Sequence, residues 1–187
     1  MVYPKKHRRI VGDLLAGKFI LQKSDLFDTI TQSFKEFYIT FFEESFGHEL
    51  KITAQYVFLI SFETNSNLSK NISIFLAILC FELDREGKNF SSEIKTGYYD
   101  IEEVNQKLLE SEYKDIIQNI NEISNLRSLI RQMNDRNIVE MKGDNRFIFT
   151  SAIEIFFNFA EEYLKQKIES EINIVNNLNN SDLDIEM

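Results

Sequence analysis

Adjacent carboxylates are the first residues in this sequence whose types could support catalysis. They occur as three Glu-Glu pairs, at residues 43–44, 102–103 and 161–162. A general acid and a general base must face the same substrate. Each pair falls in a segment predicted to be helical, where neighbouring side chains diverge by about 100°. The pairs therefore indicate solvated helix faces and not an acid–base site.

Other groups that catalysis or cofactor binding would require are missing. His7 and His48 have no second histidine three or four residues away to complete a metal pair. Cys80 is the only cysteine and lies in the apolar run ISIFLAILCF, which excludes an intrachain disulfide and favours a packing role in a reducing cytoplasm. The six glycines form no phosphate-binding loop. We predict no catalytic residues, no cofactor, no metal site and no enzymatic activity.

Basic residues between positions 127 and 146 could instead contact nucleic acid. Arg127 and Arg131 lie four residues apart on a predicted helix, and Lys142 and Arg146 flank a predicted hairpin. Acidic residues are interspersed among them, namely Glu122, Asp135, Glu140 and Asp144. Such a mixed surface favours non-specific contact with phosphates over reading of base sequence.

The overall charge limits where such contact could occur. The net charge is −9 and the pI about 4.8, the wrong sign for a protein that coats nucleic acid with its whole surface. Positive charge is local, as in KKHRR at residues 5–9, and the sequence SDLDIEM at residues 181–187 is acidic. The longest apolar run, residues 72–81, is well short of the ~20 residues that span a bilayer. We expect a cytoplasmic protein without a secretory signal or a membrane segment.

Hydrophobic spacing predicts helices followed by a hairpin in the first part of the chain. Residues 8–16 have helical spacing, and Gly17 is the predicted end of that helix before a short strand. Ser24 is the predicted N-cap of one long amphipathic helix that ends near Gly47. Its apolar stripe is predicted to be core and comprises Phe27, Ile30, Phe34, Phe37, Tyr38 and Phe41. The runs ELKITA and YVFLIS then predict a tight hairpin around Gln55.

The second part predicts a similar order of elements. Polar residues 63–71 have the composition of a linker, and a buried helix is predicted over residues 72–85, followed by a Gly- and Ser-rich connection. Asp100 is the predicted N-cap of a short helix, whose apolar side carries Val104, Leu108 and Leu109.

A longer helix is predicted next, before a second hairpin. Its apolar stripe comprises Ile116, Ile120, Ile123, Leu126, Ile130 and Met133. The runs NIVEMK and RFIFTS, joined by Gly143 and Asp144, predict the hairpin.

Helices followed by a two-stranded hairpin, occurring twice, predict a mainly α fold with small β-hairpins (α+β), in tandem winged-helix domains. The predicted boundaries are residues 1–66 and 67–168, with an acidic and flexible tail at 169–187. In DNA-binding winged helices the third helix enters the major groove and the wing touches the backbone. This geometry makes Arg127, Arg131, Lys142 and Arg146 the DNA-contact candidates.

The last long helix is apolar on two sides. One stripe contains Ile153, Phe156, Phe157, Ala160 and Leu164, and the other contains Ile155, Phe159 and Tyr163. Both sides require burial, and the second is covered either within the chain or by a protein partner. Ile155, Phe159 and Tyr163 are therefore the partner-interface candidates.

Three segments carry a resemblance to a known family: FKEFYITFFEESFGHELKITAQYVFLISF, LSKNISIFLAILCFELDREGKNFSSEI and LRSLIRQMNDRNIVEMKGDNRFIFTSAIEIFFNFAEEYL. In element order and character, notably the FLAILCFEL helix and the NIVEM…RFIFTSAIEIF ending, they resemble MukE and MksE, the accessory subunits of bacterial condensins. The likeness covers about residues 10–165. The resemblance does not extend to the tail after Lys167.

The resemblance implies a tandem winged-helix protein that homodimerises and binds the kleisin subunit (MukF/MksF-like). Through that complex it would help a separate SMC-type ATPase (MukB/MksB-like) to organise and segregate chromosomal DNA. The family provides no catalytic residues, and it implies non-specific DNA contact and association with the nucleoid. The four DNA-contact candidates come from winged-helix geometry and not from the family.

Two alternatives remain open at this point. One is the equivalent subunit of an SMC-like plasmid-defence (Wadjet-type) complex, which a neighbouring toprim-type nuclease gene would indicate. The other is a free-standing winged-helix transcription regulator, which would bind specific DNA as a dimer with a specificity ratio of ~10³ or more.

Overall fold

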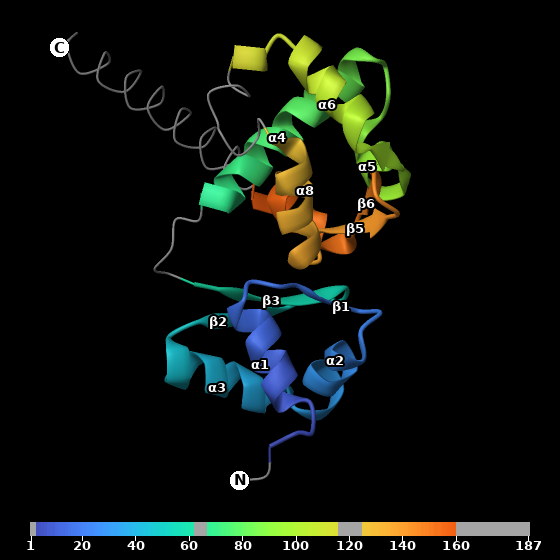
Figure 1. Cartoon of the computed structure of the whole chain (residues 1–187). Coiled ribbons are helices and arrows are strands. Elements are labelled where there is room, and N and C mark those ends of the chain that lie inside the picture. Colours follow the sequence, from blue (N-terminus) through green and yellow to red (C-terminus); the bar gives the residue numbers. More distant parts are fainter. Residues whose placement is uncertain (1–2, 62–66, 116–124, 160–187) are drawn as a thin grey trace, which may run out of the picture. The chain divides into compact units, whose positions relative to one another are not determined.

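The computed structural model describes residues 3–61, 67–115 and 125–159. As predicted, the chain has an α+β fold, with helices and two small antiparallel three-stranded sheets (Figure 1). The described residues up to Ala152 form one compact unit, and those from Ile153 onward belong to another. The predicted domain boundary at residues 66–67 and the winged-helix assignment stay predictions.

The first part of the chain combines helices with one sheet. In chain order its regular elements are α1 (His7–Leu15), β1 (Ile20–Leu21), α2 (Asp25–Asp28), the π-helical turn η1 (Thr29–Ser33), α3 (Lys35–Phe46), β2 (Glu49–Ile52) and β3 (Tyr56–Ile60). Strand β3 is central and pairs antiparallel with both β1 and β2. The predicted first helix, its end near Gly17 and the hairpin around Gln55 are confirmed.

The single long helix predicted after Ser24 is wrong, because the structure interrupts it. Ser24 caps α2 as predicted by accepting a hydrogen bond from the Leu26 amide at 3.2 Å, but α2 passes into η1 at Thr29. The hydroxyls of Thr29 and Thr31 donate to backbone carbonyls one turn earlier, at 3.0 and 2.9 Å. Such bonds bend helices, and Phe34 then leaves helical geometry with φ −138°.

This interruption changes which aromatic residues form the core. After it, α3 buries Tyr38 and Phe42 completely, whereas Phe34, Phe37 and Phe41 are only partly buried against the same core. The predicted apolar stripe is therefore correct for Phe27, Ile30 and Tyr38 and shifted elsewhere. Gly47 ends α3 in the left-handed conformation, φ +64°, as a C-cap glycine does.

The second part contains one helix that was not predicted, α5, and an earlier start of the predicted buried helix. Its regular elements are α4 (Asn67–Arg85), α5 (Phe90–Thr96), β4 (Tyr99–Asp100), α6 (Ile101–Glu110), α8 (Leu126–Asp135), β5 (Val139–Lys142), β6 (Arg146–Phe149) and the 3-10 turn η2 (Ser151–Ile153). Helix α4 begins at Asn67, so residues 67–71 are not the predicted linker. Helix α5 occupies the predicted irregular connection, where the Asn89 side chain caps it by accepting from the Ser92 amide at 3.1 Å.

Asp100 caps α6 as predicted, accepting from the amides of Glu102 at 3.0 Å and Glu103 at 3.4 Å. Val104 and Leu108 are buried as predicted, but Leu109 is 45% exposed. Ile101 takes the buried position instead, since it lies seven residues before Leu108 on one side of the helix.

Helix α8 starts at Leu126, after Asn125 with φ −113°, so the single helix predicted to pass through this point is wrong. Leu126, Ile130 and Met133 are buried as predicted. The rest of the predicted stripe, Ile116, Ile120 and Ile123, lies outside the described residues.

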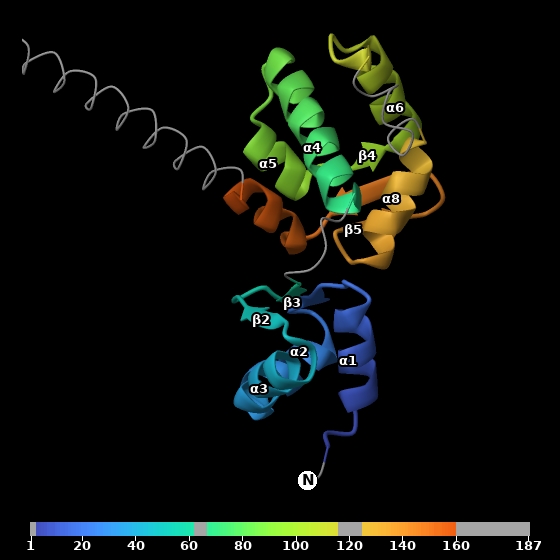
Figure 2. The same ribbon diagram turned by 90° about the vertical axis from the view of Figure 1, so that its left-hand side faces the viewer.

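The second sheet has β6 at its centre, between β4 and β5. The predicted hairpin is confirmed, with Gly143 at φ +78° in its turn. Phe147 and Phe149 face the core from β6, where the Tyr99 ring stacks on Phe147 at 5.4 Å. The two candidate elements for nucleic-acid contact, α8 and β5, lie next to each other (Figure 2).

Candidate nucleic-acid interface

Helix α8 separates apolar and basic residues onto different sides. Its buried side consists of Leu126, Leu129, Ile130 and Met133. Arg127 and Arg131 lie four residues apart on the other side, Arg127 partly buried and Arg131 exposed. The helix begins at a side-chain cap, since Asn125 accepts from the Ser128 amide at 3.1 Å.

Arg127 is occupied by contacts within the chain. One guanidinium nitrogen, Nη2, donates to Glu102 Oε1 and to Asn145 Oδ1, each at 2.9 Å. The other, Nη1, donates to the Asp144 carbonyl at 3.2 Å. Arg127 thus joins α8 to the start of α6 and to the hairpin turn. We assign it a structural role, because these contacts occupy the nitrogens that a phosphate would otherwise bind.

Arg131 lies one turn further along α8 and is free. Within the described part of the chain, its side chain makes no ion pair or hydrogen bond with another side chain. An exposed and unpaired guanidinium can form the two parallel hydrogen bonds that a phosphate accepts. Arg131 is therefore the more accessible of the two arginines on this helix.

Lys142 and Arg146 stand directly opposite each other across the β5–β6 hairpin. Like charges in this position destabilise a hairpin unless other groups offset them. Glu140 forms an ion pair with Lys142 at 2.5 Å, and Asp100 forms a longer one with Arg146 Nε at 4.0 Å. The side chain of Arg146 is 69% exposed and its ion pair with Asp100 is long, so most of its guanidinium is accessible.

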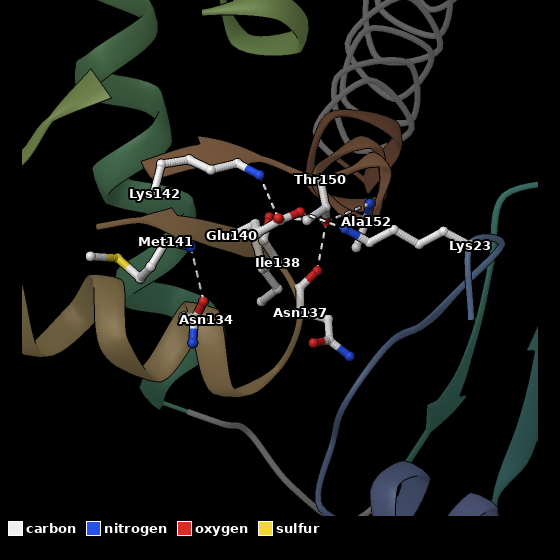
Figure 3. Close-up of polar contacts among 9 residues, drawn as sticks. All are labelled: Lys23, Asn134, Asn137, Ile138, Glu140, Met141, Lys142, Thr150 and Ala152. Atoms are coloured by element: carbon white, nitrogen blue, oxygen red, sulfur yellow. Dashed lines mark hydrogen bonds and ion pairs between the residues drawn. The ribbon is translucent and has the colours of Figure 1, made fainter. Parts of the chain in front are cut away.

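Two lysines converge on Glu140 (Figure 3). Lys23, from the loop after β1, contacts Oε2 at 2.5 Å, and Lys142 contacts Oε1 at the same distance. These hydrogen bonds, that from Lys142 first, lower the pKa of Glu140, and in return Glu140 raises the pKa of Lys142. The carboxylate stays ionised at neutral pH and neutralises part of the positive charge of the hairpin.

A polar network at the base of the hairpin holds β5 in place (Figure 3). Asn134 Oδ1 accepts from the Met141 amide at 3.1 Å, and the Thr150 hydroxyl donates to the Asn137 carbonyl at 2.6 Å. Asn137 has φ +61°, a left-handed conformation that asparagine tolerates better than most residues. This network holds the hairpin in position beside α8.

Sequence reasoning missed this network. Asn137, directly after a helix and before the β-branched pair Ile138–Val139, was a usable local signal for a left-handed residue. The ion pair between Lys23 and Glu140 had no such signal, because 117 residues separate its members.

The partner-interface candidates are only partly described. Residues 154–159 are helical, with Ile155 buried and Phe159 54% exposed. Tyr163 lies outside the described residues. Among the described residues of this helix, Phe159 is therefore the large apolar side chain that is exposed.

Groups for other chemistry are not assembled among the described residues. In that part of the chain, no three His, Cys, Asp or Glu side chains are grouped to hold a metal ion. Cys80 is half-buried, and burial raises its pKa to about 11, so it is a protonated thiol at neutral pH. The described helices also include none that is long and apolar enough to cross a bilayer.

Of the four DNA-contact candidates, Arg127 and Lys142 are closely paired with acidic partners, and Arg146 has a long ion pair of 4.0 Å with Asp100. Arg131 has no ion pair within the described part of the chain. Two accessible guanidinium groups on separate elements suit contact with a phosphate backbone. They fall short of the base-edge contacts from several side chains that direct reading of sequence requires.

Comparison with known proteins adds a family to this geometry. A family model described as "Condensin complex protein MksE" matches residues 5–161. No individual curated protein matches the chain. Because the family match spans most of the 187 residues, the chain belongs to the MksE family of condensin complex proteins.

Proposed function

We propose that this protein is the non-catalytic accessory subunit of a bacterial condensin. In this role it forms a homodimer, binds the kleisin subunit and helps the SMC-type ATPase to organise and segregate chromosomal DNA. The observation that carries the proposal is the family match over residues 5–161. The protein then works in the cytoplasm, associated with the nucleoid through its complex.

The charge distribution supports a role in which contacts with proteins dominate. Two of the four candidate cations are engaged by Glu102 and Glu140, and the net charge is −9. A regulator that bound DNA alone would need a continuous basic surface to reach useful affinity at physiological salt. A subunit held near DNA by its partners needs fewer contacts, because tethering raises the local concentration.

The proposed DNA contact is non-specific and occurs within the complex. Arg131 and Arg146 would each meet a phosphate, while Arg127 and Lys142 maintain the helix and hairpin that present them. Phe159 would contribute to the surface that receives the kleisin.

The test is purification of the tagged full chain from its native cell, with untagged cells as the control. We expect a kleisin-sized and an SMC-sized protein to accompany it in fixed ratio. Recovery of the chain without either protein would contradict the proposal. A toprim-type nuclease in the same complex would instead assign the protein to plasmid defence.

A further inference from the structure

Two lysines and one carboxylate form a charged cluster between the loop after β1 and the β5–β6 hairpin (Figure 3). The Lys23 ammonium lies 2.5 Å from Glu140 Oε2, and the Lys142 ammonium lies 2.5 Å from Glu140 Oε1. Each carboxylate oxygen thus has its own lysine, and two cations flank one anion. We call these three residues the lysine clasp. All of them belong to the compact unit that ends at Ala152.

Backbone contacts place Lys23 beside the hairpin. Phe19, four residues before Lys23, donates from its amide to the Arg136 carbonyl at 3.0 Å and accepts on its carbonyl from Asn137 Nδ2 at 2.7 Å. Asn137 lies three residues before Glu140 on the same stretch of chain. These hydrogen bonds join the two segments already, so the lysine clasp is not needed to hold them together.

The lysine clasp has one positive charge in excess. Its two ammonium groups share a single carboxylate, and among the described residues no second carboxylate is paired with either lysine. Glu140 is ionised at neutral pH, since hydrogen bonds from Lys142 and then from Lys23 lower its pKa. One lysine would be enough to neutralise Glu140. The second lysine therefore remains to be balanced by another anion.

A carboxylate between two ammonium groups occupies the place that a phosphate could take. Both anions accept charge-assisted hydrogen bonds, and lysine binds phosphate as a point charge. The side chains of Lys23 and Lys142 are 66% and 39% exposed, and exposed ion pairs contribute little to stability. Exchange of the Glu140 carboxylate for a phosphate thus costs little.

The surroundings of the lysine clasp favour a chain of phosphates over a single free anion. Arg146 lies directly opposite Lys142 across the hairpin, and its guanidinium is mostly accessible. Lys23 adds a cation from outside the hairpin. Successive phosphates of a nucleic-acid backbone can meet these three cations together, whereas a free anion meets them one at a time.

We propose that Lys23 and Lys142 form a binding site for a phosphate of the DNA backbone, which Glu140 occupies in the free chain. DNA binding exchanges the carboxylate for a phosphate, so Glu140 acts as an internal competitor that limits affinity. The inference rests on the DNA contact in the proposed function. It adds a phosphate ligand from the first part of the chain and gives Lys142 a second partner.

The experiment is titration of a short fluorescein-labelled DNA duplex with the purified full chain, followed by fluorescence anisotropy at several salt concentrations. Glu140→Gln removes the competing charge and nearly keeps the shape of the side chain. We expect it to tighten binding about 2- to 30-fold at low salt, the range that loss of two exposed ion pairs allows. The slope of log affinity against log salt concentration should steepen by roughly 0.9, because the site then offers one more positive charge to DNA.

Lys23→Gln distinguishes a phosphate ligand from a residue that acts only on Glu140. In the chain that already carries Glu140→Gln, it should weaken binding and lower the salt slope by roughly 0.9, since one phosphate contact is lost. A lysine that acted only through Glu140 would have no effect in that chain, and this result would overturn the proposal. So would a Glu140→Gln chain that binds no more tightly than the unmodified chain, or not at all, at low salt.

The matched control is Glu49→Gln. Glu49 also pairs with a lysine two residues away on a strand, Lys51, so the substitution removes the same charge from a similar pair in the first sheet. Affinity and slope should change little. An effect as large as that of Glu140→Gln would show that net charge alone is responsible and would overturn the proposal.

A second arm distinguishes DNA from a free anion as the ligand. Inorganic phosphate replaces chloride at equal ionic strength, and the advantage of Glu140→Gln in DNA binding should persist. Loss of that advantage would indicate a site for free phosphate and overturn the assignment to DNA. Circular dichroism of each variant confirms that it is folded.

Failure here is distinguishable from failure of the proposed function. A chain that co-purifies with kleisin and SMC proteins but binds DNA equally well with and without Glu140 would keep its function and lose this site. A chain that gains affinity in Glu140→Gln but has no such partners would show the reverse.

Discussion

The side-chain amide of Asn137 donates a hydrogen bond of 2.7 Å to the backbone carbonyl of Phe19, 118 residues earlier in the chain. The Phe19 amide in turn donates to the Arg136 carbonyl at 3.0 Å. One residue in a left-handed conformation thus ties the loop before β1 to the turn between α8 and β5. The same turn is where the hairpin bearing Arg146 begins.

Replacing Asn137 should therefore destabilise the fold in two separable ways. Asn137→Ala loses the hydrogen bond to Phe19 and must also hold alanine at φ +61°, so we expect a loss of about 2 kcal/mol. Asn137→Gly loses only the hydrogen bond and should cost about 1 kcal/mol or less. Urea unfolding followed by circular dichroism measures both. Equal losses would show that the left-handed conformation contributes nothing.

Arg127 and Arg131 should differ in their effects on stability although they lie one turn apart. Arg127→Ala removes contacts to Glu102, Asn145 and the Asp144 carbonyl. We expect it to lower the free energy of unfolding by about 1 kcal/mol, since the group is more than a third exposed and its ion pair is screened. Arg131→Ala should change stability by less than about 0.5 kcal/mol. The same loss from both would contradict the structural role of Arg127.

Local signals predicted much of this structure. Ser24 and Asp100 as N-caps, Gly47 as a C-cap and Gly143 in a hairpin turn are short-range devices that the chain carries at the point of use. The two hairpins followed from strand-forming runs beside those turn residues. These elements depend little on the rest of the fold.

The features that could not be predicted depend on competing local interactions or on contacts between residues that are far apart in the sequence. The structure interrupts the predicted helix at Thr29 and Thr31, although its apolar spacing continues through them. Spacing alone therefore predicted one helix, and three of the six residues of its predicted core stripe are only partly buried. Residues 67–71 are mostly polar, but they belong to α4, where Leu68 and Asn71 are buried. Arg127 pairs with Glu102, 25 residues away, and Lys23 pairs with Glu140, 117 residues away, so spacing in the sequence predicts neither contact.

DNA retention by the assembled complex should depend on Arg131 and Arg146. Arg131→Gln together with Arg146→Gln removes two proposed phosphate contacts. We expect the slope of log affinity against log salt concentration to fall by roughly 2, since each contact contributes about 0.9. Lys51→Gln is a matched control, because Lys51 is already paired with Glu49. An unchanged slope in the double variant would remove both arginines from the DNA surface.

Substitutions at Ile155 and Phe159 should distinguish an effect on folding from an effect on partner binding. Phe159 is 54% exposed, so Phe159→Glu should leave the unfolding transition in place and reduce recovery of the kleisin-sized protein. Ile155 is buried, and Ile155→Glu should destabilise the fold by several kcal/mol, since it buries a carboxylate without a partner. Pull-down and thermal unfolding of each variant measure these effects. If Phe159→Glu unfolds the protein, Phe159 belongs to the core.

Cys80 should make stability fall at alkaline pH. Burial raises the pKa of its thiol from 9.0 to about 11, so the folded state holds this proton more tightly than the unfolded state. The resulting stabilisation is complete below pH ~9 and is lost as pH rises toward 11. The slope of unfolding free energy against pH in this window should be less negative in Cys80→Ser, because serine does not titrate there. Tyr38, whose pKa burial raises to about 12, maintains a residual slope in both proteins.

The same shift in pKa predicts that the thiol of Cys80 reacts slowly with alkylating reagents. At pH 8 the thiolate fraction falls about 100-fold when the pKa rises from 9.0 to about 11. Alkylation of Cys80 by iodoacetamide should therefore be at least that much slower in the folded chain than in urea, and it should accelerate with pH up to about 11. A folded chain that reacts as fast as the unfolded one at pH 8 would show that burial on α4 does not protect this thiol.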